Sequence, residues 1–280
     1  MVSRHLTIPH RIACVTDMPE GIDSHITIIR PPGEFEGLET PTWNGDKPNC
    51  FRRLAMFRPD AADIFGEHFV CMDLDCVIAA NIDALFDRDD DFIMYKGTSF
   101  DRPYNGSLLM LRAGTRPQVY LDFTEENAIK SGQKYVGSDQ AWISYCLGPN
   151  EKTWSFEDGI CWWHSQYNAQ IDTKRIMFFP GQMKPWETVK EGTDKWIIEH
   201  YVGNKEGKKC AILGYNKTVW TDLEEALNEH GPFDDYIVSP EVSDYWGDNF
   251  IDVAATDSQA IRLARMYGYD NPVFCGATDK

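Results

Sequence analysis

FVCMDLD, residues 69–75, is the stretch that decides the fold, because it places two carboxylates after an apolar run. The pattern predicts a buried strand over 68–74. In α/β sheets, ligands bind at the carboxyl ends of strands. Since alternate residues of a strand project to the same face, we expect Asp73 and Asp75 to point the same way. Two such carboxylates can hold a hard divalent cation, Mn²⁺ or Mg²⁺.

Strands and helices alternate on both sides of this stretch. Further strands are expected at 11–16, 25–29, 92–95 and 107–111, and helices at 50–57, 83–86, 117–129 and 138–145. Ser138 is a suitable N-cap for the last of these helices. This alternation predicts a three-layer α/β domain over residues 1–202, with helices on both faces of its sheet.

A second, smaller α/β domain is expected over residues 210–280. It follows a polar, glycine-bearing segment at 203–209 that is typical of a linker. Strands are predicted at 210–213, 236–238 and 273–274, with one helix opened by the capping-box pair Thr221 and Glu224 and another over 259–267. The unit is Rossmann-like, but the turn after its first strand lacks the GxGxxG pattern, so we expect no dinucleotide there.

The charge of the chain restricts its partners. The 44 acidic and 27 basic residues give a formal net charge of −17. Such a surface repels phosphate backbones and anionic lipid, so nucleic acid and membrane surfaces are not expected partners. No apolar stretch approaches about 18 residues, and the first residues do not resemble a signal peptide, which predicts a cytoplasmic protein without a membrane span. An acidic protein that binds an anionic nucleotide needs a metal ion or a local basic cluster.

Several motifs occur in one order along residues 3–200. They are RLAMF (53–57), CMDLDC (71–76), NIDALFD (81–87), YNGSLLML (104–111), GSDQ (137–140) and PGQMKPW (180–186). In this order they resemble the retaining glycosyltransferases related to glycogenin and the bacterial galactosyltransferases. The resemblance implies a GT-A fold and transfer of a sugar from a nucleotide-diphosphate donor, with a UDP-sugar favoured, to a hydroxyl acceptor of unknown identity.

The resemblance also implies roles for individual residues. Asp73 and Asp75 would hold Mn²⁺ or Mg²⁺ and touch the nucleotide. Arg53 and Lys184 would neutralise the diphosphate. The donor sugar and the reacting centre would be contacted by Asn105, Asp139 and Gln140.

Two departures from the family pattern favour an alternative without catalysis, in which the chain binds a sugar nucleotide or serves as a scaffold. Phe178 stands where the family has a metal-binding histidine, and His164 is the nearest histidine that could replace it. The family also begins with a strand and a nucleotide-binding loop ahead of the segment that starts here at Ser3, so an apolar sheet position is expected to be exposed.

A second enzyme class fits the same acids. Asp73-Leu74-Asp75 followed by Cys76 and Val77 also satisfies the signature of haloacid-dehalogenase phosphatases, in which the first aspartate is the nucleophile. That class needs a later lysine and a distant second acidic pair. The acids at 89–91 follow too closely to supply that pair.

Overall fold

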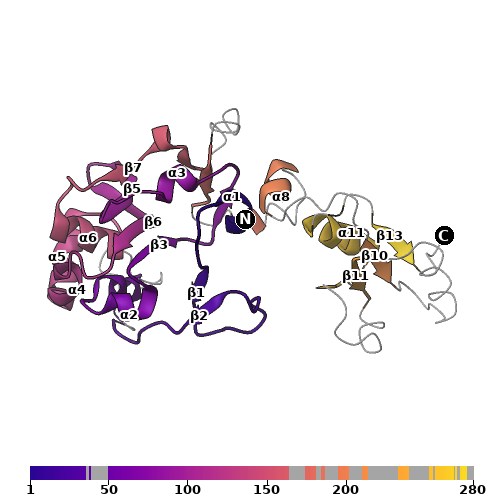
Figure 1. Ribbon diagram of the computed structural model, residues 1–280, viewed down its shortest axis with the longest axis horizontal. Helices are drawn as coiled ribbons and strands as arrows, with labels where there is room; N and C mark the ends of the chain where they lie inside the picture. Colours follow the sequence, from indigo (N-terminus) through magenta and orange to yellow (C-terminus); the bar gives the residue numbers. More distant parts are fainter. Residues whose placement is uncertain are drawn as a thin grey trace. The chain divides into compact units, whose positions relative to one another are not determined.

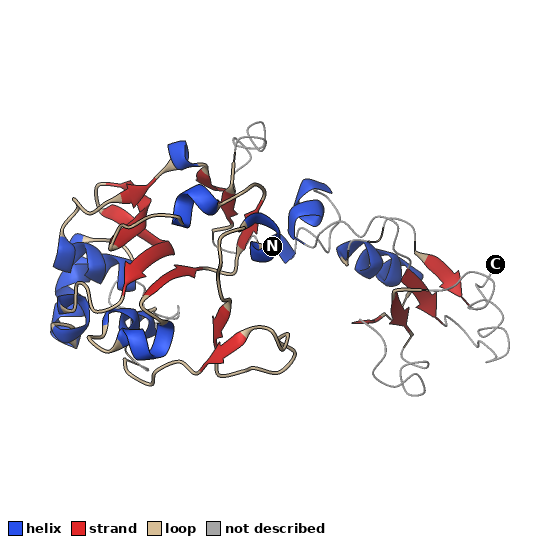
Figure 2. Ribbon diagram, viewed as in Figure 1, coloured by secondary structure: helices blue, strands red, loops and turns tan. Residues whose placement is uncertain are grey.

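The chain is a mixed α/β protein that divides into two compact units, each described below by itself (Figures 1 and 2). The computed structural model describes residues 1–35, 38, 50–163, 174–180, 184–186, 195–201, 210–213, 233–239, 252–254, 256–267, 269 and 272–275. The larger unit comprises residues 3–74 and 80–178, and the smaller unit comprises residues 1–2, 75–79 and 179–280. The predicted linker at 203–209 and the helix predicted to begin at Thr221 lie outside the described residues.

A four-stranded mixed sheet forms the centre of the larger unit. Its order is β3-β6-β5-β7, with bounds His68–Met72 for β3, Arg102–Arg112 for β6, Phe92–Ser99 for β5 and Thr153–Trp154 for β7. β6 pairs antiparallel with both β3 and β5, and β7 pairs parallel with β5. The three predicted strands of this region are therefore confirmed, and two of them are longer than expected because the β5–β6 hairpin continues past its apolar residues.

Helical segments cover one face of this sheet. They are η1 (Phe51–Phe57), α2 (Ala61–Phe65), α4 (Gln118–Leu121), α5 (Glu125–Lys134) and α6 (Asp139–Leu147). Their buried side chains form one apolar core with β5 and β6. Two helix predictions need correction. The helix expected over 50–57 is a 3₁₀ helix, and the helix expected over 117–129 is two helices, because Thr124 takes an extended conformation and caps α5 through the Asn127 amide.

Aromatic residues cover the opposite face. Tyr95 of β5 lies 5.5 Å, between ring centroids, from Trp162 and 5.9 Å from Phe178. These two rings belong to β8 (Ile160–Trp162) and β9 (Ile176–Phe178), which pair parallel and follow the 3₁₀ helix η2 (Phe156–Asp158). Phe86 of α3 (Asp83–Phe86) packs edge-on against Trp154. Packed elements therefore cover both faces of the sheet, while a GT-A arrangement stays a prediction.

The first residues of the larger unit are tied to α3. After α1 (Val2–His5), the backbone amide and hydroxyl of Thr7 both donate to the Asp83 carboxylate. The chain then forms β1 (Ala13–Val15) and β2 (Thr27–Ile29), which pair only with each other among the described strands, in parallel. Both predicted strands are thus present. Val15 and Ile28 remain exposed.

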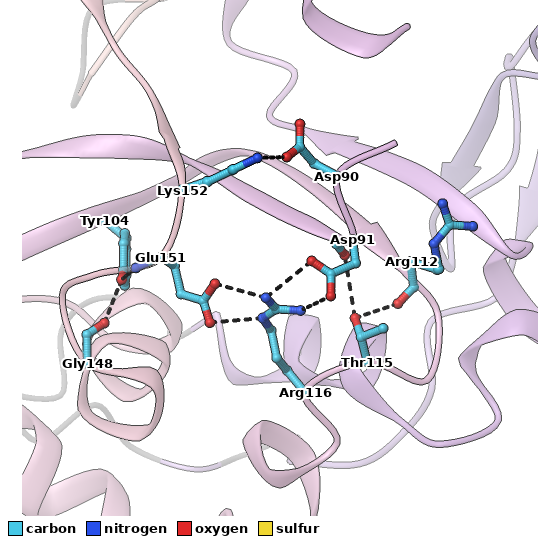
Figure 3. A network of polar contacts seen from close by, with 9 residues as sticks. All are labelled: Asp90, Asp91, Tyr104, Arg112, Thr115, Arg116, Gly148, Glu151 and Lys152. Atoms are coloured by element: carbon cyan, nitrogen blue, oxygen red, sulfur yellow. Dashed lines mark hydrogen bonds and ion pairs between the residues drawn. The ribbon is translucent and has the colours of Figure 1, made fainter. Parts of the chain in front are cut away.

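A network of charged side chains lies beside the end of β6 and the start of β5 (Figure 3). Arg116 binds two carboxylates, Asp91 at 3.0 and 3.3 Å and Glu151 at 3.0 and 2.9 Å. Its guanidinium also lies 4.8 Å from the ring centroid of Phe92. Beside it, Tyr104 donates to the Gly148 carbonyl and accepts from the Glu151 amide. This network fixes the 148–152 turn against β5 and β6.

The smaller unit contains a parallel four-stranded sheet of order β12-β11-β10-β13. The strands are β10 (Cys210–Leu213), β11 (Asp235–Val238), β12 (Asp252–Val253) and β13 (Val273–Cys275), and α11 (Asp257–Met266) precedes the last. The unit also holds β4 (Cys76–Ile78) and α8 (Lys195–Tyr201). The predicted strands and the predicted last helix are confirmed. No helix in the described part of the chain is long and apolar enough to cross a bilayer.

Candidate functional site

A β-bulge in the middle of β6 creates the candidate site. Met94 pairs with Leu109, but the next residue of β5, Tyr95, pairs with Asn105, so residues 106–108 of β6 are extra. Asn105 stabilises the bulge by accepting a hydrogen bond from the Ser107 amide at 2.8 Å. Bulges of this kind bend a strand and re-aim its groups, and they are common beside active sites. Here the bulge releases the backbone of Gly106 from the ladder with β5.

Side chains from two other elements satisfy the released backbone groups of Gly106. Its carbonyl oxygen accepts a hydrogen bond from Nη2 of Arg53, which lies on η1. Its amide donates to Oε1 of Gln140, on α6, at 3.2 Å. Because buried backbone groups must be paired, this glycine is the point at which η1, β6 and α6 are joined.

Arg53 also forms ion pairs with two aspartates. Its Nη1 atom lies 3.2 Å from Oδ1 of Asp73 and 3.7 Å from Oδ2 of Asp139, and Nη2 donates to the sulfur of Cys71 at 3.5 Å. Burial alone would lower the pKa of Arg53, but its negative neighbours raise that pKa above its ordinary value. The guanidinium is therefore a permanent positive charge at the centre of the site.

Asp139 is the most deeply buried of these acids. The residue is 6% exposed, at the first position of α6. Burial raises the pKa of its carboxyl above the ordinary value, and the positive charge of Arg53 opposes this rise without cancelling it. A buried carboxyl with a raised pKa beside a fixed cation is typical of functional sites.

The beginning of α6 differs from the prediction. Ser138 occupies the N-cap position, but its side chain makes no capping hydrogen bond. Instead its hydroxyl accepts from the Cys50 amide at 3.0 Å and so ties α6 to the start of η1. The preceding Gly137 has φ of +113° and leaves no space for a β-carbon beside Gln140, so a glycine is required there.

Gln140 uses both ends of its amide within the protein. Oε1 accepts from Gly106, and Nε2 donates to the Val136 carbonyl at 3.1 Å. Its contacts thus hold the bulge in place. Asn105 differs, because within the described part of the chain its Nδ2 group has no hydrogen-bond acceptor, although the residue is 7% exposed.

The two acids of the opening motif do not lie on a strand as predicted. β3 ends at Met72, and Asp73 continues the ladder by one hydrogen bond, from its amide to the Ser107 carbonyl at 2.9 Å. The strand alternation that was expected to aim both carboxylates to one face therefore does not extend to Asp75.

In the smaller unit, Asp75 is joined to Lys184. The Lys184 ammonium donates to the Asp75 carboxylate and, at 3.5 Å, to the Phe179 carbonyl. The Phe179 amide in turn donates to the Asp75 carbonyl at 2.8 Å. Both side chains are partly exposed, at 22% for Asp75 and 25% for Lys184. The two residues, predicted from separate motifs to hold the cation and the diphosphate, are thus in direct contact.

The carboxylates of Asp73 and Asp75 are hard oxygen donors, which fits Mn²⁺ or Mg²⁺. Phe178, at the predicted histidine position, is 1% exposed and packed among aromatic rings, so it provides no ligand. Among the described residues no group of three or more His, Cys, Asp or Glu is placed to hold a metal, and His164 lies outside them. Magnesium is commonly held by one or two carboxylates together with substrate phosphate. A metal at Asp73 and Asp75 stays a prediction.

The acidic residues at 89–91, considered above for the phosphatase interpretation, include two that pair with basic side chains. Asp90 pairs with Lys152 and with Arg88, and Asp91 pairs with Arg116. The Asp90–Lys152 and Asp91–Arg116 contacts belong to the network of Figure 3. The positive charge beside Asp73 comes from an arginine, whereas the phosphatase interpretation requires a lysine.

Gly106 is the residue that sequence reasoning missed, since Asn105 was singled out instead. An isolated glycine within an apolar strand pattern indicates a bulge or a close backbone approach, and that signal was present in YNGSLLML. Ser138 was assigned a helix-capping role that it does not have.

Comparison with known proteins adds no family assignment. No protein-family model matches the chain, and no curated protein matches it at a significant level.

Proposed function

We propose that this chain is a glycosyltransferase that binds a nucleotide-diphosphate sugar with Mn²⁺ or Mg²⁺ and transfers the sugar to a hydroxyl acceptor. The observation that carries the proposal is the convergence of Arg53, Asp73, Asp139 and Gln140 on the bulge at Gly106. These residues come from three separate segments, η1, the end of β3 and the start of α6, and the sequence motifs predict a site role for all four. The acids surround the fixed positive charge of Arg53, and some of these side chains are partly exposed to solvent. Such a group suits the recognition of a charged ligand.

The residues divide into three roles. Asp73 and Asp75 would hold the divalent cation, which when bound acts as a Lewis acid on the departing diphosphate. Arg53 and Lys184 would offset the negative charge of the diphosphate, as a chain of net charge −17 requires. A UDP-sugar is the favoured donor.

The remaining residues face the sugar or support those that do. Asn105 has an amide NH₂ group available for a sugar hydroxyl, and Asp139 provides a buried carboxyl near Arg53. Gln140 is a positioning residue in this scheme, because its side chain is fully used in holding Gly106 and Val136.

Calorimetric titration of UDP and GDP into the purified chain tests the proposal. With Mn²⁺ we expect binding of micromolar strength, and a chelator should abolish it. The double variant Asp73→Asn, Asp75→Asn should not bind. Asp63→Asn, at an exposed position of α2, is the matched control and should bind as the unchanged chain does.

Turnover separates an enzyme from a binding protein. We expect slow, metal-dependent hydrolysis of the UDP-sugar when no acceptor is present. Tight binding without hydrolysis would favour the non-catalytic alternative. Binding that ignores both the chelator and the double substitution would contradict the site assignment.

A further inference from the structure

The loop that joins β5 to β6 presents one exposed phenylalanine. Phe100 is 91% exposed, more than any other large apolar side chain among the described residues. It lies in the two-residue loop between Ser99 and Arg102, which pair with each other. Such loops favour Gly, Pro, Asn, Asp and Ser, which supply particular backbone angles or local hydrogen bonds. Neither the turn nor the core therefore explains a phenylalanine at this position.

Backbone contacts hold this loop in place. A β-carbon at Gly97 would lie 1.6 Å from the Arg102 carbonyl oxygen, so only glycine lets the two strands approach as they do. Within the loop the Ser99 hydroxyl donates to the Asp101 carboxylate. The Asp101 carbonyl accepts from the Val136 amide at 2.9 Å. The exposed ring is thus carried by a loop that is fixed to the segment before α6.

The same segment connects the loop to the candidate site, within the larger unit. The Val136 carbonyl accepts from Nε2 of Gln140 at 3.1 Å, and Gln140 in turn holds the bulge of β6. Asp139 follows Val136 by three residues. Along β6, Arg102 and Asn105 are also three residues apart, which corresponds to about 10 Å of strand. A ligand that spans a few sugar residues can therefore reach from the loop to the candidate site.

The surroundings of Phe100 suit a saccharide better than a protein. Specific protein interfaces bury on the order of 1,000 Å² or more, whereas one phenylalanine offers about 200 Å². Its neighbours Thr98, Ser99 and Asp101 are exposed and polar. A sugar ring has an apolar C–H face that can stack on an aromatic ring, and hydroxyls at its edge that can bond to such neighbours. The Asp101 carboxylate and the net charge of −17 favour a neutral sugar over an acidic one.

We propose that Phe100 stacks against a neutral saccharide, and that this saccharide is the acceptor of the transfer. The inference rests on the proposed function and goes beyond it by naming the class of acceptor. In the transfer an acceptor hydroxyl oxygen bonds to the donor sugar, the bond from that sugar to the diphosphate breaks, and the hydroxyl proton passes to the released diphosphate. Phe100 is a positioning residue, because it holds the acceptor and takes no part in this step.

Fluorine NMR of the chain labelled with fluorophenylalanine tests the stacking directly. The Phe100 signal is identified by its absence from Phe100→Leu. The probes are maltose, cellobiose, lactose and chitobiose, which are neutral and differ in their rings and linkages. We expect at least one of them to shift the Phe100 signal, and the same disaccharide to accelerate the consumption of a UDP-sugar.

Substitutions at position 100 separate stacking from general apolarity. Calorimetry with that disaccharide should show binding weakened on the order of 10-fold in Phe100→Ala and in Phe100→Leu, which keeps an apolar side chain without an aromatic face. Phe100→Trp should bind it at least as tightly as the unchanged chain. Leu121→Ala, at a 61% exposed position of α4, is the matched control and should bind it normally. Thermal unfolding checks that each variant is folded.

The outcomes separate this inference from the proposed function. If the unchanged chain binds UDP with Mn²⁺ but no disaccharide shifts the Phe100 signal, the acceptor inference alone is wrong. Equal disaccharide binding in Phe100→Leu and the unchanged chain would also overturn it. If Phe100→Ala instead dissociates an oligomer in sedimentation, the ring belongs to an interface between copies of the chain. Disaccharide binding in a chain that binds no UDP would overturn the proposed function, and the saccharide would then not be an acceptor.

Discussion

Gly106 and Arg53 are in direct contact: the arginine donates to the glycine carbonyl, and a β-carbon at position 106 would lie 3.2 Å from its Nη1 atom. The same β-carbon would lie 3.2 Å from Oδ2 of Asp139. The space between the sheet and the ion pair is therefore filled by backbone, and a side chain there must displace charged groups.

Gly106→Ala is expected to disturb the site more than the fold. Arg53 and Asp139 must each shift by a few tenths of an ångström, so Mn²⁺-dependent UDP binding should weaken about 10-fold, with a loss of stability of about 1 kcal/mol from overpacking. Calorimetry and urea unfolding measure the two effects. Gly33→Ala is the control, because nothing lies within 4 Å of its added β-carbon. Unchanged UDP binding in Gly106→Ala would show that the guanidinium is not tightly placed.

Asp139→Asn is expected to stabilise the chain at neutral and alkaline pH. Burial raises the pKa of Asp139, so the folded state resists its ionisation. A group whose pKa is raised in the folded state contributes stability below its unfolded pKa. This contribution is lost as pH rises through the folded pKa. The advantage of the asparagine in thermal unfolding should therefore grow as pH rises above 3.8, the ordinary pKa of an aspartate, while UDP binding is lost. Asp63→Asn should show no such trend. A less stable Asp139→Asn at pH 8 would contradict the assignment of burial as the dominant cause.

Asp83 should make the anchoring of the first residues sensitive to acid. Hydrogen bonds from Asn81 and then from Thr7 lower the pKa of Asp83 to about 2. The contribution of Asp83 to stability is fully present above its unfolded pKa of 3.8 and is lost as pH falls through about 2. Hydrogen exchange of the Thr7 amide should therefore stay protected at pH 4 and lose protection near pH 2. In Asp83→Asn the amide should be poorly protected at both values, and equal protection in the two chains would refute the anchor.

Arg116 is expected to be the most sensitive position of the network in Figure 3. Arg116→Ala leaves Asp91 and Glu151 without their shared partner, at a side chain that is only 17% exposed. We expect a loss of about 2–3 kcal/mol in the free energy of unfolding by urea.

The backbone of Arg116 provides the matched comparison. Its φ of +54° is unusual for a residue with a β-carbon. Arg116→Gly should therefore be less destabilised than Arg116→Ala, by about 1 kcal/mol. Equal losses in the two variants would mean that the backbone carries no strain at Arg116. A loss below about 0.5 kcal/mol in both would mean that the network stabilises the fold no more than an exposed surface ion pair does.

The sequence by itself determined the local elements and the identity of the charged residues. The apolar run before Asp73 predicts β3 because a buried strand needs only a few consecutive apolar side chains, and the parallel strands of the smaller unit follow from the same signal. A predicted side-chain contact failed where a tertiary contact competes with a local preference. Ser138 is a good N-cap by composition, yet its hydroxyl accepts from Cys50, 88 residues away in the chain.

The tertiary structure alone decided how the charged residues pair. Register and the bulge in β6 bring Arg53 to Asp73 and Gly106, and no local pattern encodes a contact between residues so far apart in the chain. The strand geometry that the two acids were expected to share ends with β3 at Met72. A short window of sequence sets which backbone conformation is favoured, whereas a polar contact depends on where two separately folded segments meet. For this reason the residues of the candidate site could be named from the sequence, and their partners could not.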